Sequence, residues 1–311
     1  MKQINMLKML EDILIKIENL KKKEYIDLVN KIKSIDKLKF LFTNDDECID
    51  HIHRCILNVP IHPFLNEYIN LYLKYNPEKI NEQDKNLLKT PLMYACDIYD
   101  KNSETINIIL NYSPNLEIKN YVEDTVLLYV CKMNTKNLNK IIKLLIDKGA
   151  NVNIINIYFK NTPLHSICMN KCSDKNTYKL LLKANANPNY KNVYNHKAII
   201  YFIKNKSKED DSTIIDLFIK YGLIFDNINN NLNYIDYALV NEKIKCLNCI
   251  IKYYNNLDIM SGIKIPEFNY KTQKIIKILY HYNCDFETLK LAISKGANKK
   301  DLINENLINF F

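Results

Sequence analysis

One motif recurs along this chain at a nearly constant interval, and this recurrence restricts the possible folds more than any other feature of the sequence. The copies begin with threonines 35 and 37 residues apart, at Thr90, Thr125 and Thr162. Asparagines near the other end of the copies recur every 36 residues, at Asn115, Asn151 and Asn187. A period of about 20 to 50 residues is typical of repeat architectures, in which each copy buries its apolar side against the next. We therefore expect a linear array of similar units.

The residues of each copy fit two helices joined by a turn. A threonine such as Thr162 can cap a helix by accepting a backbone N–H, and Pro163 directly after it costs no helical hydrogen bond. Gly149 is expected to end the second helix in the left-handed conformation. Ser113 and Asn185 replace this glycine in the neighbouring copies, and asparagine tolerates that conformation better than serine does.

These motifs resemble the ankyrin repeat. The copy from Thr162 reads Thr-Pro-Leu-His-Ser-Ile, close to the ankyrin pattern T-P-L-H-x-A, and residues 149–153 read Gly-Ala-Asn-Val-Asn. The resemblance implies an all-α ankyrin-repeat solenoid of stacked helix-turn-helix pairs, each with a hairpin-like loop. It also implies that His165 ties its own turn to the neighbouring copy by a structural hydrogen bond.

The resemblance divides the chain into four parts. Residues 84–226 hold four recognisable repeats, 41–83 a degenerate ankyrin-like repeat, and 227–311 degenerate repeats with a C-terminal cap. Residues 1–40 follow an amphipathic pattern without the repeat motif, and we expect an N-terminal helical cap there. The outer helix pairs are predicted at residues 48–57 and 64–75, 233–239 and 243–254, and 272–282 and 286–295, with an inserted loop at 258–269.

Composition disfavours several classes of protein. The net charge of +9 is spread over 311 residues with acidic residues interspersed, whereas nucleic acid binding normally needs a concentrated basic face. The nine cysteines lack disulfide-type spacing, which is typical of a reducing compartment. We find neither a signal peptide nor an apolar run long enough to cross a membrane. The expected location is the cytoplasm, with a nuclear fraction allowed.

No residue cluster predicts catalysis or a bound metal. Two groups of residues have some metal-ligand character: Cys48, His51, His53 and Cys55, and the pair Cys246 and Cys249. A structural zinc site usually joins two separated ligand pairs, so helix packing is the favoured interpretation of both groups. The G-x-S-x-G and H-E-x-x-H patterns are absent from the sequence. We expect no enzyme activity, no cofactor and no metal.

Candidate partner-binding residues lie in the loops and in one helical column. Loop tips are exposed and commonly carry recognition. Here the tips hold aromatic and basic residues, at Tyr121, Tyr158, Phe159, Lys160, Tyr190, Lys191 and Tyr194. A column on the first helices includes Tyr94 and Tyr129. Packing between repeats, or between adjacent loops, is the alternative interpretation of both sets.

The resemblance implies a non-enzymatic protein-protein interaction module that binds through the concave face and the loop tips. The Lys-, Asn- and Ile-rich sequence is similar to ankyrin proteins of large DNA viruses, poxviruses in particular, which implies a host protein as partner. We expect a monomer without membrane attachment. A structural scaffold, a ubiquitin-ligase substrate adaptor and a nucleic-acid-binding protein are the alternatives.

Overall fold

The described part of the chain is helical. The computed structural model describes residues 51–60, 65–170, 174–205 and 211–225, and single positions or short runs at 23, 24, 26, 27, 30, 234, 237, 238, 241, 243, 245–250, 252 and 253. No β-strand occurs among these residues, which contain only an isolated bridge between Lys191 and Lys197. The prediction of an all-α fold is confirmed. Most of the N-terminal cap, the 258–269 loop and the last predicted helix pair lie outside the described residues.

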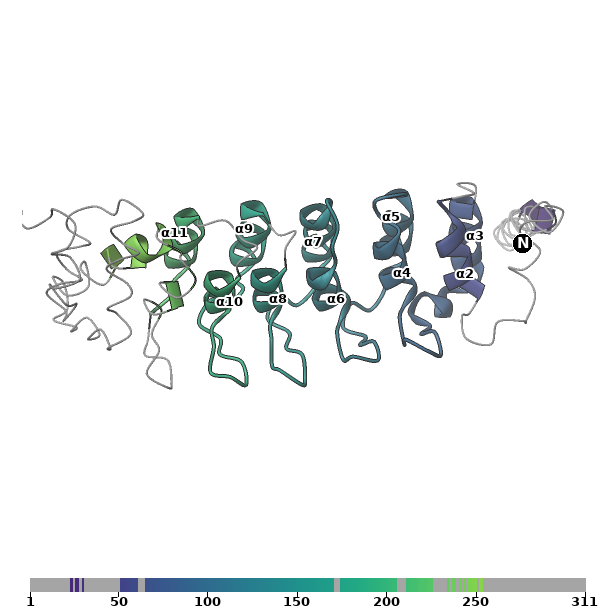
Figure 1. The fold of residues 1–311 in the computed structure, drawn as a ribbon. Helices are drawn as coiled ribbons and strands as arrows, with labels where there is room; N and C mark the ends of the chain where they lie inside the picture. The colour runs from purple at the N-terminus through teal and green to yellow at the C-terminus, as the bar shows by residue number, and fades with distance from the viewer. Residues whose placement is uncertain are drawn as a thin grey trace, which may run out of the picture. The chain divides into compact units, whose positions relative to one another are not determined.

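Pairs of short helices alternate with hairpin loops along the sequence (Figure 1). The labelled helices are α2 (His51–Asn58), α3 (Leu65–Tyr75), α4 (Pro91–Asp97), α5 (Glu104–Asn111), α6 (Val126–Lys132), α7 (Leu138–Asp147), α8 (Pro163–Met169), α9 (Lys175–Lys183), α10 (Ala198–Lys204) and α11 (Ser212–Lys220). A 3₁₀ helix, η2 (Pro77–Asn81), follows α3. The described positions at 234, 237, 238, 245–250, 252 and 253 are helical as well, within the predicted fifth pair.

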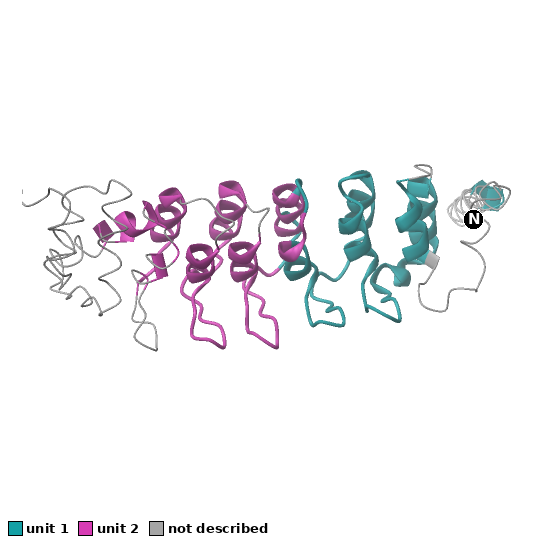
Figure 2. Ribbon diagram, viewed as in Figure 1, with its two compact units in different colours: residues 1–130, 135–137, 147–150 teal, residues 131–134, 138–146, 151–311 magenta. Residues whose placement is uncertain are grey.

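The chain divides into two compact units, coloured separately in Figure 2. Unit 1 comprises residues 1–130, 135–137 and 147–150, and unit 2 comprises residues 131–134, 138–146 and 151–311. The division falls within the repeat that contains α6 and α7. Each unit is described by itself below, and the predicted boundaries at residues 40, 83 and 226 stay predictions.

Helices pack in the same way inside each unit. In unit 1, α2 packs on α3 and α4, while α5 packs on α3 and α4. In unit 2, α8 packs on α9 and α10, and α9 packs on α11. The ring of Tyr178 on α9 lies edge-on to Phe202 of α10 at 5.9 Å and tilted to Phe218 of α11 at 6.2 Å. Burial of apolar side chains between successive pairs is therefore what stabilises the stack within a unit.

The helix starts follow the predicted capping chemistry, with one exception. The Thr90 hydroxyl accepts the Met93 N–H at the start of α4, and the Thr162 hydroxyl accepts the His165 N–H at the start of α8. The hydroxyl of Thr125, before α6, is buried and has no hydrogen-bond partner among the described residues. The threonine that begins each copy therefore caps the following helix in two of the three copies.

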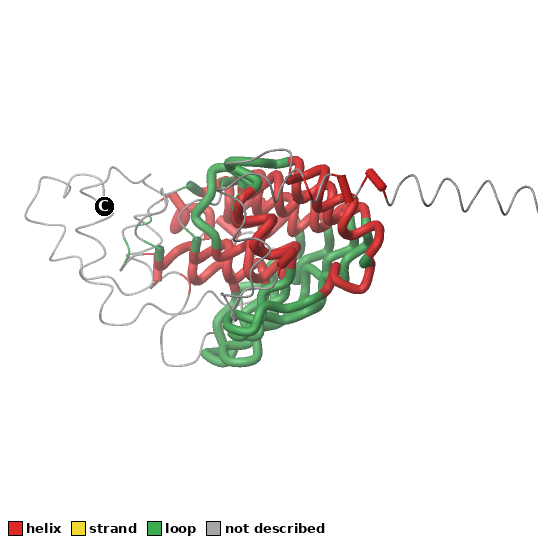
Figure 3. The backbone as a smooth tube through the Cα atoms, turned by 90° about the vertical axis from the view of Figure 1, so that its right-hand side faces the viewer, coloured by secondary structure: helices red, strands yellow, loops and turns green. Residues whose placement is uncertain are grey.

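The helix ends also match the prediction. The residues that follow the second helices have positive φ angles, at Ser113 (52°), Gly149 (90°), Asn185 (65°) and Gly222 (87°). A left-handed residue at this position is a common way for a chain to leave a helix. Within each unit, the hairpin loops lie together on one side of the helices, drawn green in Figure 3. These loops carry the residues considered next.

Candidate protein-interaction surface

A column of buried polar side chains holds the hairpin loops in shape. It consists of residues 36 positions apart, Asp84, Asn120, Asn156 and Asn192, each at most 5% exposed. In every loop this side chain accepts hydrogen bonds from the backbone N–H groups of residues that follow it in the sequence. Asn156 Oδ1 accepts the Tyr158 N–H at 3.0 Å and the Phe159 N–H at 3.2 Å. Asp84 accepts three such groups, at 2.7 to 2.9 Å.

Backbone hydrogen bonds close each of these loops. The Asn156 N–H donates to the Asn161 carbonyl at 2.9 Å, and the Asn192 N–H donates to the His196 carbonyl at 3.0 Å. Just before each closing residue the chain is left-handed, as at Lys160 with φ 51° and at Asn195 with φ 58°. The tips are thus fixed by side-chain and backbone hydrogen bonds instead of being open coil.

In unit 2, two adjacent loops expose a set of large apolar side chains. Their exposed fractions lie between 49% and 63%, and we call them the tip patch: Ile157, Tyr158, Phe159, Val193 and Tyr194. The rings of Phe159 and Tyr194 stack at 6.3 Å with 24° between their planes. The Val193 N–H donates to the Phe159 carbonyl at 3.1 Å, so the two loops are joined directly.

Unit 1 has a smaller version of this surface. The Tyr121 N–H donates to the Leu87 carbonyl at 3.0 Å, the same kind of link between successive loops. Leu87, Leu88 and Tyr121 are 38%, 41% and 56% exposed. Because two of the three are aliphatic and less exposed, this surface offers fewer aromatic contacts than the tip patch.

His165 lies behind the tip patch and joins two repeats of unit 2. Its Nδ1 accepts the Thr162 N–H at 3.3 Å and lies 2.8 Å from the Thr162 hydroxyl, while its Nε2 lies 3.0 Å from the His196 carbonyl oxygen. Burial lowers the pKa of His165 to about 4, so the ring is neutral at physiological pH. The structural hydrogen bond predicted for this histidine is confirmed.

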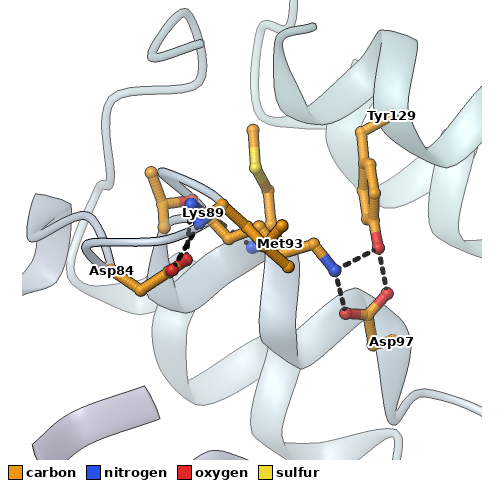
Figure 4. Close-up of polar contacts among 7 residues, drawn as sticks. Asp84, Lys89, Met93, Asp97 and Tyr129 are labelled. Atoms are coloured by element: carbon orange, nitrogen blue, oxygen red, sulfur yellow. Dashed lines mark hydrogen bonds and ion pairs between the residues drawn. The ribbon is translucent and has the colours of Figure 1, made fainter. Parts of the chain in front are cut away.

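The tyrosine column of unit 1 is tied into the helix stack. Tyr94 is 5% exposed and Tyr129 is half-buried. The Lys89 ammonium donates to the Tyr129 hydroxyl at 2.7 Å and pairs with the Asp97 carboxylate at 2.9 Å, and the Tyr129 hydroxyl in turn donates to Asp97 (Figure 4). The same ammonium lies over both rings, 5.3 Å from the Tyr94 centroid and 4.7 Å from that of Tyr129.

Burial raises the pKa of both phenols. For Tyr129 the second cause is its hydrogen bond to Asp97, and for Tyr94 it is the charge of Asp84. Both groups therefore stay neutral and act as hydrogen-bonding and cation–π partners within the unit. A role for Tyr94 and Tyr129 in partner contact stays a prediction.

Comparison with known proteins agrees with this geometry. Residues 92–192 match the family model of ankyrin repeats in three copies. These residues are ankyrin repeats. The described part of the chain has the fold of an ankyrin-repeat solenoid, as the sequence motifs predicted. No curated protein matches the chain in sequence.

Two solved structures illustrate the fold. One is the Bd0816 predatory endopeptidase from Bdellovibrio bacteriovorus in complex with the immunity protein Bd3460, which has a chain similar to this one with a TM-score of 0.51 and 23% identity over 64% of this chain and 97% of that chain. The other is the ankyrin repeat domain of Bcl-3, a member of the IkappaB protein family, with a TM-score of 0.53 and 16% identity over 68% and 86%. At these identities the similarity concerns the fold alone.

The predicted tip residues of the ankyrin repeats differ in accessibility. Tyr121, Tyr158, Phe159, Lys160 and Tyr194 are exposed. Tyr190 and Lys191 are half-buried, and the Tyr190 ring lies edge-on to His165 at 6.3 Å. Ile157 and Val193 complete the tip patch but were not predicted, because an aliphatic residue within a loop gives no distinct sequence signal.

The asparagine column behind the tips was also missed by sequence reasoning. Asparagine is abundant throughout this chain, and the first member of the column is an aspartate, Asp84. The constant interval of 36 residues is the signal that could have identified it.

The candidate metal ligands take part in other contacts. His53 Nε2 lies 3.1 Å from the Glu82 carbonyl oxygen, and the Cys249 thiol donates to the Asp216 carboxylate at 2.9 Å. Cys48 lies outside the described residues. Among the residues that the structure describes, no group of three or more His, Cys, Asp or Glu side chains could hold a metal ion. Likewise, no helix in the described ranges has the length and apolar character needed to span a bilayer.

Proposed function

We propose that this protein is a non-enzymatic recognition module that binds a protein partner through the tip patch of unit 2. The observation that carries the proposal is the exposure of five large apolar side chains on two loops whose backbones are held by buried asparagines. Contiguous exposed apolar side chains of this kind mark interaction sites on folded domains.

The composition of the tip patch favours a protein partner. Tyrosine and phenylalanine supply large contact areas with few rotatable bonds, so that little conformational entropy is lost on binding. The buried Asn156 and Asn192 fix the loops before the partner arrives, which lowers the ordering cost further. Ankyrin repeats generally serve protein-protein interaction, and one similar solved structure is itself a complex with an immunity protein.

We also propose the origin of the partner, the compartment and the oligomeric state in which this interaction takes place. We propose that the Lys-, Asn- and Ile-rich sequence is that of a viral ankyrin protein, whose partner would be a host protein. Five of the described cysteines are buried, where cysteine packs as a small apolar side chain, and this favours a reducing compartment such as the cytoplasm; they are Cys55, Cys96, Cys131, Cys168 and Cys246. We further propose that the chain acts as a monomer. A dimer in light scattering would favour the scaffold alternative instead.

A capture experiment from host cytosol tests the assignment. Full-length protein is compared with the double variant Tyr158→Ala/Phe159→Ala and with a control, Met169→Ala. Met169 is also an exposed apolar residue of unit 2, with 38% of its surface accessible. It is the last residue of α8, whereas the tip loop precedes the first residue of that helix. The double variant is expected to lose the captured proteins while the control keeps them. Equal recovery by all three proteins would show that the tip patch is not the binding site.

A further inference from the structure

Two successive loops of unit 2, with the first helices that follow them, carry positively charged side chains and no carboxylates. Residues 154–169 and 190–205 contain four lysines and no aspartate or glutamate. The corresponding segments of the two preceding repeats, residues 82–97 and 117–132, each contain two lysines and three carboxylates. The two segments that hold the tip patch therefore carry only positive charge, whereas the equivalent segments of the two earlier repeats carry both signs, with one more carboxylate than lysine in each.

Two of these four lysines are exposed beside aromatic side chains. Lys160 directly follows the tip residues Tyr158 and Phe159, and Lys204 ends α10. Lys197 is different, because it is buried and its ammonium donates to the Asn189 side chain and the Ile224 carbonyl at 3.1 and 2.7 Å. Lys191 is half-buried, so the fully exposed positive charge lies at Lys160 and Lys204.

A continuous line of rings connects these two lysines. Phe159 stacks on Tyr194, Tyr194 lies 6.3 Å from His196, and His196 lies edge-on to Tyr237 at 5.9 Å. The Lys204 ammonium lies over the Tyr237 ring, 5.1 Å from its centroid. Burial, and then the Lys204 charge, lower the pKa of His196, so this line is neutral between its two cations.

From this arrangement we infer that the partner of unit 2 is a protein segment that alternates acidic and large apolar side chains. This inference rests on the proposed function and specifies the chemistry of the bound segment. Its apolar side chains pack on Tyr158, Phe159 and Tyr194, and its carboxylates meet Lys160 and Lys204. Charge complementarity of this kind selects the partner and speeds its association. A basic segment is rejected, because no carboxylate in these loops and first helices can pair with it.

A single-stranded nucleic acid is the other anionic ligand that aromatic and basic groups can bind. The tip patch favours a peptide for two reasons. Phe159 and Tyr194 already stack on each other, so one face of each ring is taken, and Ile157 and Val193 offer no flat surface for a base. The exposed cations are also few, whereas nucleic acid binding depends on neutralising many phosphates.

The test uses defined probes and the full chain. Two pools of short fluorescent peptides are compared, one drawn from Asp, Glu, Leu, Phe and Ser and one from Lys, Arg, Leu, Phe and Ser, beside a single-stranded DNA oligonucleotide. The wild-type protein is expected to bind the acidic pool at least about tenfold more tightly than the basic pool, and to lose most of this preference at about 0.5 M salt.

Two double variants with the same change in net charge separate the effect of charge at the tip patch from the effect of the overall charge. Lys160→Glu/Lys204→Glu should abolish the preference for the acidic pool. The control Lys179→Glu/Lys183→Glu makes the same change in charge at two exposed lysines of α9, and it should keep the preference for the acidic pool. Equal binding of both pools, tighter binding of DNA, failure of all probes to bind, or equal effects of the two variants would each overturn the inference. The proposed function is judged separately, by loss of the captured proteins in Tyr158→Ala/Phe159→Ala.

Discussion

His165 Nε2 lies 3.0 Å from the carbonyl oxygen of His196, a residue 31 positions further along the chain and in the next repeat. Because His165 Nδ1 accepts the Thr162 N–H, the ring proton must reside on Nε2, which donates to that carbonyl. One neutral side chain thus caps its own helix and holds the neighbouring loop. Protonation of Nδ1 would remove the acceptor and place a charge in a buried site.

Stability should therefore depend on pH through His165. Its pKa in the folded protein is about 4, below the unfolded value of about 6.5, so the unfolded chain takes up the proton first as the pH falls. The stability that neutral His165 contributes is fully present above the pKa of the unfolded state, and it is lost as the pH falls from about 6.5 to 4. From pH 7 to 5 we expect a loss of roughly 2 kcal/mol in the free energy of unfolding, measured with urea. His165→Gln should remove this part of the pH dependence. An unchanged slope would contradict the assignment.

Two threonines at the same repeat position should respond oppositely to loss of their hydroxyl groups. Thr162→Val removes an acceptor used by the His165 N–H and should destabilise the protein by about 1 to 2 kcal/mol. Thr125→Val removes a buried hydroxyl that has no partner within the described ranges, and should be neutral or stabilising. Urea unfolding of both variants gives the comparison. Similar losses would mean that the Thr125 hydroxyl has a partner after all.

The left-handed position at the helix ends predicts another pair of opposite effects. Ser113 has φ 52° and Gly149 has φ 90°, although a side chain is strained in this region. Ser113→Gly should stabilise the protein by about 0.5 to 1 kcal/mol, and Gly149→Ser should destabilise it by about 1 kcal/mol or more. Apart from Gly149 and its two chain neighbours, no residue has a heavy atom within 4 Å of the place that a Cβ would take, so the loss would come from the backbone conformation. Thermal unfolding of both variants measures the effects, and shifts of the same sign would refute this explanation.

The features set by local chemistry were predictable from the sequence. Thr162, Pro163 and Gly149 define helix starts and ends through capping and backbone preference, which need no knowledge of the neighbouring repeat. The features that depend on the next repeat were not. The hydrogen bond that the Tyr129 hydroxyl accepts within unit 1, for example, comes from Lys89, 40 residues earlier in the chain.

The contacts between loops could not be predicted either, because the loops differ in length from one repeat to the next. The loop that opens at Asp84 closes at Lys89, and the next one opens at Asn120 and closes at Asp124, one residue sooner. A difference of one residue moves every following side chain out of alignment. The sequence predicted Tyr158, Phe159 and Tyr194 as tip residues. The motif does not predict that Ile157 and Val193 join them in one patch, or that Phe159 stacks on Tyr194.

The last prediction concerns how the asparagine column supports binding. Asn156→Ala removes the acceptor for the Tyr158 and Phe159 N–H groups, which should lower the free energy of unfolding by about 1 to 3 kcal/mol. It should also weaken partner binding by about tenfold, because the tip must then be ordered during binding. Asn156→Asp keeps an acceptor, as Asp84 does in its own loop, and should have the smaller effect on both quantities. Urea unfolding and a binding titration measure the two effects.

Asn192 provides the comparison within unit 2. Its Oδ1 accepts the Tyr194 and His196 N–H groups, and its amide also donates to the Asn161 side chain and the Tyr201 hydroxyl, at 2.8 and 2.7 Å. Asn192→Ala should therefore lower the free energy of unfolding by about 1 to 3 kcal/mol, since the Asn161 side chain and the Tyr201 hydroxyl also lose a partner. If Asn156→Ala lowered stability but left binding unchanged, the loop conformation would not matter for recognition, and the affinity of the tip patch would come from its exposed side chains alone.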